Sequence, residues 1–294
     1  MARYQRAFIL IPMNLIRTAR KLTRQYLLYL KYREILMCNK KLKNTKNKRC
    51  FIIGTGPSIK DQDLLRLKNE YTFVVNTFWN HPQYQAIDPA YYILTDPEVF
   101  PNNRDRGDFW QKEILEKTSV IETCPRTELF LNISGKEFVE KNNLFREHAI
   151  HYLALSGHFR DNLNFNTDID RVIPTTKNVI VAAIIIATYM GFDELYLLGC
   201  EHSFLAQPAQ DYYRKFQEFY KTNYDEKNPE QIKRYAMDIM TYEGHIDNIK
   251  ILFKNYRLLK QKLAKEKPAV KIYNATPNSY LDVFPYIKFE NIKL

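Results

Sequence analysis

Short apolar runs alternate with polar stretches along most of the chain. The runs at residues 50–53, 72–75, 91–94, 128–131, 195–198 and 271–273 have the length and composition of buried β-strands. Residues 178–190 are apolar on almost every side, which predicts a buried helix, and weaker helical patterns cover 61–67 and 246–265. Strands that alternate with helices favour an α/β fold with a mostly parallel sheet and helices on both faces.

Two segments fall outside this alternation. Residues 204–240 are rich in aromatic and charged side chains and show no strand pattern, so we expect a lid there. Residues 1–49 are basic, and their last part, 39–49, has the polar composition of a linker. The pattern therefore predicts a helical arm with its linker over 1–49. One domain, large enough for a sizeable core, is predicted over 50–294.

The formal net charge of +11 is concentrated in the arm. Residues 1–49 hold 14 Lys and Arg against one acidic residue, Glu34, and the rest of the chain holds 30 basic against 32 acidic residues. The arm therefore carries +13 and the body −2. A nearly neutral body offers no basic footprint, so no nucleic-acid partner is expected.

Apolar residues of the arm lie between the basic ones, as in an amphipathic helix. The longest apolar run is interrupted at Pro12 and Asn14, whereas a membrane-spanning helix needs about 20 apolar residues. The arm also lacks the cleavage site of a signal peptide. We expect it to lie on an anionic membrane surface, at the inner face of the cytoplasmic membrane. Packing against the body or against a second copy of the chain is the alternative.

The cysteines indicate a reducing, cytoplasmic compartment. Cys38, Cys50, Cys124 and Cys200 show neither CxxC nor zinc-ligand spacing, so neither a redox pair nor a metal site is expected.

The first predicted strand runs into the turn Gly54-Thr-Gly-Pro-Ser58. Glycines let a phosphate or a ribose approach the backbone closely, and Ser58 can cap a following helix or donate a hydrogen bond. The turn is shorter than a dinucleotide-binding fingerprint and lacks the GK[ST] of a Walker A loop. An ordinary strand-to-helix turn is the alternative interpretation.

Polar residues follow two further predicted strands. Asn76 directly follows the strand at 72–75, and Asp96 comes soon after the strand at 91–94. Ligands bind beyond the carboxyl ends of the strands in an open parallel sheet, so both are candidates for a binding site. Turn chemistry also accounts for them, above all for Asp96 before Pro97. His245, in Tyr242-Glu-Gly-His, can take a proton near neutral pH.

Taken in order, these motifs resemble the bacterial sialyltransferases of the Campylobacter lipooligosaccharide type. The chain also resembles the glycosyltransferase domain of motility-associated factors and an archaeal pterin pyrophosphokinase. The ordered set is more specific for this superfamily than for one donor sugar. It covers about residues 50–285 and comprises Phe51-Ile-Ile-Gly-Thr-Gly-Pro-Ser58, Asn76, the helix to Gly191-Phe192, Leu195-Tyr-Leu-Leu-Gly199, Tyr242-Glu-Gly-His245 and Pro277-Asn-Ser279.

The resemblance implies a Rossmann-like domain of the metal-independent GT-A-like type, with a CMP-sugar as donor substrate and no other cofactor. It makes His245 the general base and places Tyr242 in the catalytic set. Ser203, Tyr212 and Tyr213 are the candidates for contacts near the donor phosphate. The nucleotide-binding residues that it implies are Gly54, Thr55, Gly56, Pro57, Ser58, Asn76, Asp96, Thr175, Thr176, Asn178, Gly199 and Glu201.

The chain departs from the family pattern at two strand ends. An Asn-Pro of the family is Asp96-Pro97 here, and a Gly-x-Asp is Gly199-Cys-Glu201. A carboxylate at position 96 could hold the hydroxyls of a ribose or, alternatively, a metal ion.

The sequence thus predicts an inverting glycosyltransferase that moves a sialic-acid-like (nonulosonic) sugar from a CMP-activated donor to a saccharide or glycolipid acceptor, as in lipopolysaccharide biosynthesis. A nucleotide-dependent pyrophosphokinase of the pterin type is one alternative, with Asp96 and Glu201 holding Mg²⁺. A non-catalytic nucleotide-sugar-binding protein is the other. A homo-oligomer is compatible with each of these functions.

Overall fold

The computed structural model describes residues 13–97, 99–100, 107–203 and 242–294. The predicted lid, with Tyr212 and Tyr213, lies outside these residues, as does the beginning of the arm.

The described residues form one sheet of seven parallel strands in the order β5-β4-β3-β2-β1-β6-β7. This is the Rossmann-like α/β arrangement expected from the sequence, and each predicted strand is confirmed. An additional strand, β5, falls in a region where no strand was predicted. The strands are β1 (Arg49–Ile53), β2 (Thr72–Val75), β3 (Tyr91–Leu94), β4 (Glu128–Asn132), β5 (Ile150–Leu153), β6 (Glu194–Leu198) and β7 (Lys271–Asn274).

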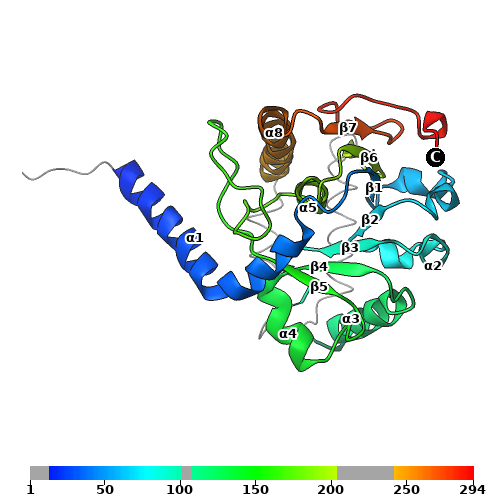
Figure 1. Ribbon diagram of the computed structural model, residues 1–294, viewed down its shortest axis with the longest axis horizontal. Helices are drawn as coiled ribbons and strands as arrows, with labels where there is room; N and C mark the ends of the chain where they lie inside the picture. The colour runs from blue at the N-terminus through cyan, green and yellow to red at the C-terminus, as the bar shows by residue number, and fades with distance from the viewer. Residues whose placement is uncertain (1–12, 98, 101–106, 204–241) are drawn as a thin grey trace, which may run out of the picture.

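Helices cover both faces of the sheet (Figure 1). On one face lie α5 (Val179–Met190) and α8 (Tyr242–Glu266), which share an apolar core with alternate residues of the strands. The other face carries 3₁₀ segments and three helices. They are the 3₁₀ segments η2 (Pro57–Lys60), η3 (Leu64–Leu67) and η4 (Phe78–Asn80), and the helices α2 (Tyr84–Ile87), α3 (Gly107–Ile121) and α4 (Lys136–Lys141).

The short helix expected at 61–67 is confirmed only over its last four residues, and it is a 3₁₀ helix. The structure has the 3₁₀ segment η3 there, preceded by Asp63 in a non-helical conformation. Leu64 and Leu67 are both fully buried. Residues three apart are eclipsed in a 3₁₀ turn, so one such turn buries both leucines on the same side.

Helix α5 is buried along its whole length, as its sequence predicts. The Asn178 side chain caps its first turn by accepting a hydrogen bond from the backbone N–H of Ile180 at 2.7 Å. Gly191 ends the helix in the left-handed region, at φ 96°. Both ends of α5 are therefore fixed by local chemistry, which sets the position of its N-terminus at the sheet edge.

The arm helix α1 (Met13–Met37) extends away from the body at its start and reaches edge strand β5 at its end (Figure 1). Leu36, just before its end, is fully buried. In the 3₁₀ segment η1 (Cys38–Leu42), Asn39 is buried and donates hydrogen bonds to the carbonyls of Tyr152 and Ile169 at 2.9 and 3.0 Å. The last part of the arm thus packs on the body. Whether 1–49 and 50–294 are separable units stays a prediction.

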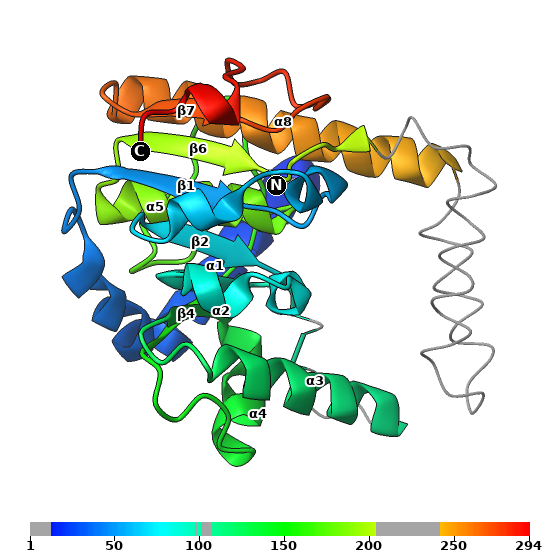
Figure 2. The same ribbon diagram turned by 90° about the vertical axis from the view of Figure 1, so that its right-hand side faces the viewer.

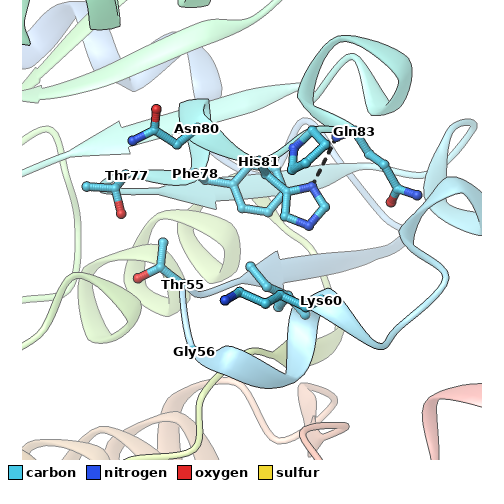
Figure 3. Close-up of a pocket in the computed structure, with 10 residues that line it drawn as sticks. Thr55, Gly56, Lys60, Thr77, Phe78, Asn80, His81 and Gln83 are labelled. Atoms are coloured by element: carbon cyan, nitrogen blue, oxygen red, sulfur yellow. Dashed lines mark hydrogen bonds between the residues drawn. The ribbon is translucent and has the colours of Figure 1, made fainter.

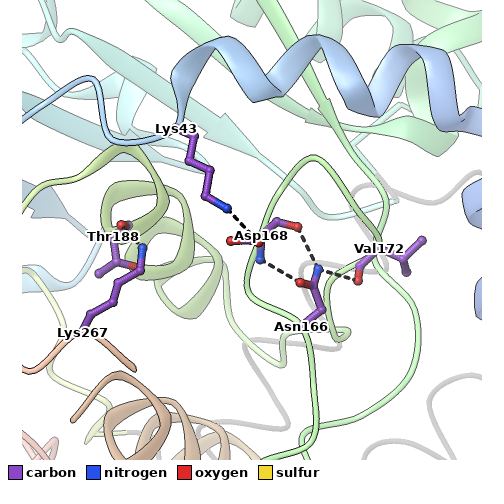
Figure 4. Close-up of polar contacts among 6 residues, drawn as sticks. All are labelled: Lys43, Asn166, Asp168, Val172, Thr188 and Lys267. Atoms are coloured by element: carbon purple, nitrogen blue, oxygen red, sulfur yellow. Dashed lines mark hydrogen bonds and ion pairs between the residues drawn. The ribbon is translucent and has the colours of Figure 1, made fainter. Parts of the chain in front are cut away.

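The linker is tied to the loop that precedes α5, and the segment after α8 is tied to the end of α5 (Figure 4). Lys43 forms an ion pair with Asp168 at 3.0 Å. Lys267, beyond the end of α8, donates to the carbonyl of Thr188 at 2.5 Å, and burial lowers its pKa. These contacts fasten the end of the sheet opposite the strands' carboxyl ends.

The carboxyl ends of the strands lie together at one edge, and the N-terminal end of α8 extends past the sheet on the same side (Figure 2). Loops that follow β1, β2 and β6 therefore converge with the start of α8, which is the arrangement that a ligand site requires in such a fold. Within the described part of the chain, no helix is long and apolar enough to cross a membrane.

Candidate functional site

A pocket of about 240 Å³ opens at the carboxyl ends of β1, β2 and β6. The N-terminus of α5 closes it on one side. It brings together most of the residues to which the sequence assigns nucleotide binding. Its lining consists of Gly54, Thr55, Gly56, Pro57, Val75, Asn76, Asn178, Val179, Ile180, Gly199, Cys200, Glu201, His202 and Ser203.

Three glycines bring the turns after β1 and β6 into direct contact. The backbone N–H groups of Gly54 and Gly56 donate to the carbonyls of Leu198 and Gly199 at 2.8 and 3.0 Å. A Cβ on Gly56 would lie 2.7 Å from the carbonyl oxygen of Gly199, and Gly199 itself has φ 62°. Glycine is therefore needed here for close backbone packing. The glycines of the Gly54–Ser58 turn therefore have a structural role, as in an ordinary strand-to-helix turn, whether or not the turn also binds a ligand.

Glu201 occupies the position in this turn where an external anion was expected. Its Oε1 accepts a hydrogen bond from the backbone N–H of Ser58 at 2.6 Å. The residue is buried, and its Oε2 has no hydrogen-bond partner among the described residues. A phosphate at this N–H would have to displace the carboxylate. Glu201 instead offers a ligand an acceptor oxygen, because a buried carboxylate oxygen is costly to leave unsatisfied.

Asn76 lies in the left-handed region, at φ 50°. The phenol of Tyr92, which is fully buried in β3, donates to the carbonyl of Asn76 at 2.7 Å and accepts from the N–H of Trp79 at 2.9 Å. This bridge fixes the backbone between β2 and η4. Asn76 is thereby held with its side chain exposed at the pocket, and Asn tolerates this conformation better than most residues.

Asn178 has two tasks at this site. Its Oδ1 caps α5, while the residue also lines the pocket. Its amide nitrogen is therefore the group that remains to contact a ligand. Thr175 and Thr176, expected in the same role, are not among the residues that line the pocket. The backbone N–H of Thr175 donates to Gly157 at 3.2 Å instead.

His202 also lines the pocket, although no role was predicted for it. Its Nε2 lies 3.0 Å from the phenol oxygen of Tyr256, which is fully buried in α8. Burial lowers the pKa of His202 to about 4, so its imidazole is neutral at pH 7. Burial also raises the pKa of Tyr256. This pair joins the turn after β6 to helix α8, and the backbone of His202 is left-handed, at φ 50°.

The Thr276-Pro-Asn-Ser279 motif supports the turn after β6 from behind. The backbone N–H of Cys200 donates to the Thr276 hydroxyl at 3.0 Å, and the Ser279 hydroxyl donates to the carbonyl of Cys200 at 2.6 Å. The N–H of Tyr280 donates to the carbonyl of Glu201 at 2.8 Å. This motif therefore positions Glu201 and His202 rather than forming the pocket wall.

The remaining predicted residues lie around this pocket or beyond it. Asp96 follows β3, is exposed and does not line the pocket. Tyr242 and His245 fall in the first turn of α8, one turn further into the helix than the sequence suggested. Burial lowers the pKa of His245, which keeps its imidazole in the proton-accepting form at neutral pH. In the described part of the chain, no three His, Cys, Asp or Glu side chains are grouped as a metal site.

Comparisons with known proteins yield matches among solved structures. No family model matches the sequence, and no curated protein matches it significantly. The structure of the MAf glycosyltransferase from Magnetospirillum magneticum AMB-1 is similar over 89% of this chain, with 14% identity and a TM-score of 0.45. This chain spans 39% of that protein's length.

The sialyltransferase CstII from Campylobacter jejuni, solved in complex with a substrate analogue, cytidine-5′-monophosphate, is also similar to this chain. It matches over 81% of this chain and 84% of its own, with 18% identity and a TM-score of 0.37. Both proteins belong to groups that the sequence motifs resemble.

Proposed function

We propose that the protein is a glycosyltransferase that uses a CMP-activated, sialic-acid-like sugar. The observation that carries the proposal is the pocket at the sheet edge, where Gly56, Asn76, Asn178 and Glu201 meet although they come from four separate segments. The ordered motifs that resemble sialyltransferases include Gly56 and Asn76. The position of the pocket is also the one where α/β folds bind nucleotides.

The polar groups of the pocket suit a nucleoside better than a free phosphate. Oε2 of Glu201 is a buried acceptor that two ribose hydroxyls can satisfy. The amides of Asn76 and Asn178 can bind the base or the ribose from the other side.

The reaction exchanges one bond at the anomeric carbon. The bond from that carbon to the phosphate oxygen of CMP breaks, and a bond to an acceptor hydroxyl oxygen forms. His245 takes the proton of the acceptor hydroxyl, and the electron pair of the broken bond leaves with CMP. CMP is a good leaving group, so we expect the step to proceed without a metal ion.

The arm suits an acceptor at a membrane surface. Tyr26, Leu27 and Leu30 of α1 are 61%, 58% and 48% exposed, next to the basic Arg24 and Lys31. Exposed apolar side chains flanked by basic ones favour the interface of an anionic membrane. A glycolipid acceptor would then lie within reach of the pocket, with the protein on the inner face of the cytoplasmic membrane.

Thermal-shift measurements with CMP, UMP, GDP and ATP, each with EDTA or Mg²⁺, test the nucleotide. A ligand that binds only the native state raises the melting temperature by mass action. We expect CMP to give the largest shift in EDTA, and CMP-N-acetylneuraminic acid to be turned over in the same buffer. A preference for ATP with strict dependence on Mg²⁺ would favour a pyrophosphokinase, and CMP binding without turnover would favour a binding protein.

A further inference from the structure

A second pocket, of about 400 Å³, lies on the other side of the Gly54–Ser58 turn (Figure 3). It shares Thr55 and Gly56 with the first pocket, so these two residues form the wall between them. Its volume falls within the roughly 300–1,000 Å³ of small-molecule sites. The function proposed above does not use it.

Two segments face each other across this second pocket. The segment that follows β1 contributes Thr55, Gly56, Ile59 and Lys60, and the segment that follows β2 faces it (Figure 3). That opposite wall consists of Thr77, Phe78, Asn80, His81, Pro82 and Gln83.

Its opposite wall is rigid. The rings of Phe78 and His81 stack at a centroid distance of 5.0 Å and an interplanar angle of 2°. Nδ1 of His81 accepts a hydrogen bond from the N–H of Gln83 at 3.2 Å, and burial lowers the pKa of His81. His81 is therefore a neutral structural group, and Lys60 is the cation of this pocket.

The two pockets differ in charge. The first contains the carboxylate of Glu201, whereas the second contains Lys60 and is lined by no acidic residue. Lys60 forms no ion pair with any described residue. A ligand with one anionic group will therefore place that group in the second pocket and its neutral, hydroxyl-bearing part beside Glu201.

The other lining groups are those that bind a sugar ring. Ile59, Phe78 and Pro82 offer apolar surface to the C–H groups of a ring, while Thr55, Thr77 and Asn80 offer hydrogen bonds to its hydroxyls. Lys60 adds a charge-assisted hydrogen bond to a carboxylate. We propose that the second pocket binds a saccharide that carries a carboxylate, with Lys60 as the residue that recognises the acid. This inference rests on the proposed function, which places the nucleotide in the adjacent first pocket.

Calorimetric titration with the α-methyl glycoside of N-acetylneuraminic acid and with its methyl ester tests this pocket. The two probes differ only in the charge that Lys60 would meet. We expect the acid to bind the parent protein about tenfold or more tightly than the ester, and Lys60→Met to remove this difference while affinity for the ester stays. Lys68→Met is the control, because Lys68 is also exposed but lines neither pocket.

Several results would overturn the inference. They are equal binding of acid and ester to the parent, no effect of Lys60→Met on the acid, or Lys60-dependent binding of inorganic phosphate with no binding of either sugar. CMP is titrated into the same samples. If CMP binds and neither sugar does, this inference fails while the proposed function stands. If the acid binds through Lys60 and CMP does not bind, the proposed function fails and the pocket stands.

Competition between the acid and the nucleotides shows whether the second pocket binds the sugar of the donor or the sugar of the acceptor. If the acid is displaced by CMP-N-acetylneuraminic acid but not by CMP, the pocket holds the sugar of the donor. If the acid binds together with both nucleotides, the pocket holds the acceptor. Either result supports the second pocket as the site of the acid. If CMP without a sugar displaces the acid, the acid occupies the nucleotide pocket, and the inference is overturned.

Discussion

The carboxylate of Glu201 fills the space above Gly56 that a Cβ at position 56 would need. Gly56→Ala must therefore expel this carboxylate from the Ser58 N–H and also crowd the Gly199 carbonyl, 2.7 Å from the new atom. We expect a loss of about 1–3 kcal/mol in the free energy of unfolding, measured in urea. In a Glu201→Ala background the loss should shrink without vanishing, because the Gly199 carbonyl remains. Parent-like stability of Gly56→Ala would contradict this packing.

Glu201 is expected to recognise the ribose of the nucleotide. In Glu201→Gln the side-chain oxygen can still accept the hydrogen bond from the Ser58 N–H. The Oε2 acceptor, which has no partner among the described residues, is replaced by an NH₂ group that only donates. Affinity for CMP should fall about tenfold, while affinity for 2′,3′-dideoxy-CMP should stay at the parent value. Calorimetry on both ligands decides this. An equal loss for both nucleotides would mean that Glu201 acts only by shaping the turn.

His245 is expected to be the general base. His245→Ala should keep the melting temperature and CMP affinity of the parent but lower the rate of transfer by about 10²–10⁴-fold. Burial lowers the pKa of His245, so the transfer rate of the parent should stay high down to a pH below the ordinary histidine value of about 6.5. The decrease of the rate at low pH, which reports the protonation of His245, should be absent from the residual activity of His245→Ala. Lys250→Ala, an exposed change further along α8, is the control.

His202 should make stability depend on pH. Its pKa is about 4 in the native state and about 6.5 in the unfolded chain, so the unfolded state binds more protons between these values. The stabilisation is present above pH 6.5 and is lost as the pH falls toward 4. His202→Asn suits the left-handed backbone and cannot titrate. From pH 7 to 4 the parent should lose about 2–3 kcal/mol more than this variant in urea unfolding. Parallel curves would show that His202 does not contribute.

The start of the arm is expected to drive membrane association. Deleting residues 1–31 removes seven basic residues together with the exposed Tyr26, Leu27 and Leu30, and it leaves Leu36, Asn39 and Leu42 in place. The shortened protein should fold and bind CMP but no longer sediment with anionic vesicles, given about 1 kcal/mol per basic residue at the surface. Deleting 1–45 should destabilise the fold, because it removes those buried residues. Unchanged vesicle binding by the first deletion would leave packing against a second copy as the role of α1.

Much of the fold follows from the sequence because parallel strands and a wholly buried helix need continuous apolar runs. The runs at β1, β2, β3 and β6 and at α5 have no other good interpretation. β5 was not predicted because His151, a titratable residue, interrupts the apolar run at Ile150–Leu153. In the structure His151 is buried against Glu128 of the neighbouring strand, at 2.7 Å.

The site was predictable where it depends on strand ends, and not where it depends on contacts between distant segments. Asn76 and Gly199 directly follow strands, so their place at one edge follows from topology. That the Glu201 carboxylate would fill the glycine turn depends on the register between β1 and β6, which no local pattern encodes. The same holds for the pairing of His202 with Tyr256, which lies 54 residues further along the chain.

The wall shared by the two pockets has a consequence for changing what the protein accepts. A substitution at Thr55 or Gly56 alters both pockets at once, so under the proposed function selection for a new sugar at these positions would also disturb the proposed nucleotide site. Thr77, Asn80 and Gln83 line only the second pocket. They belong to the segment whose backbone the Tyr92 hydroxyl holds through hydrogen bonds to Asn76 and Trp79. Libraries aimed at sugar preference should therefore vary these three positions and leave the glycine turn untouched.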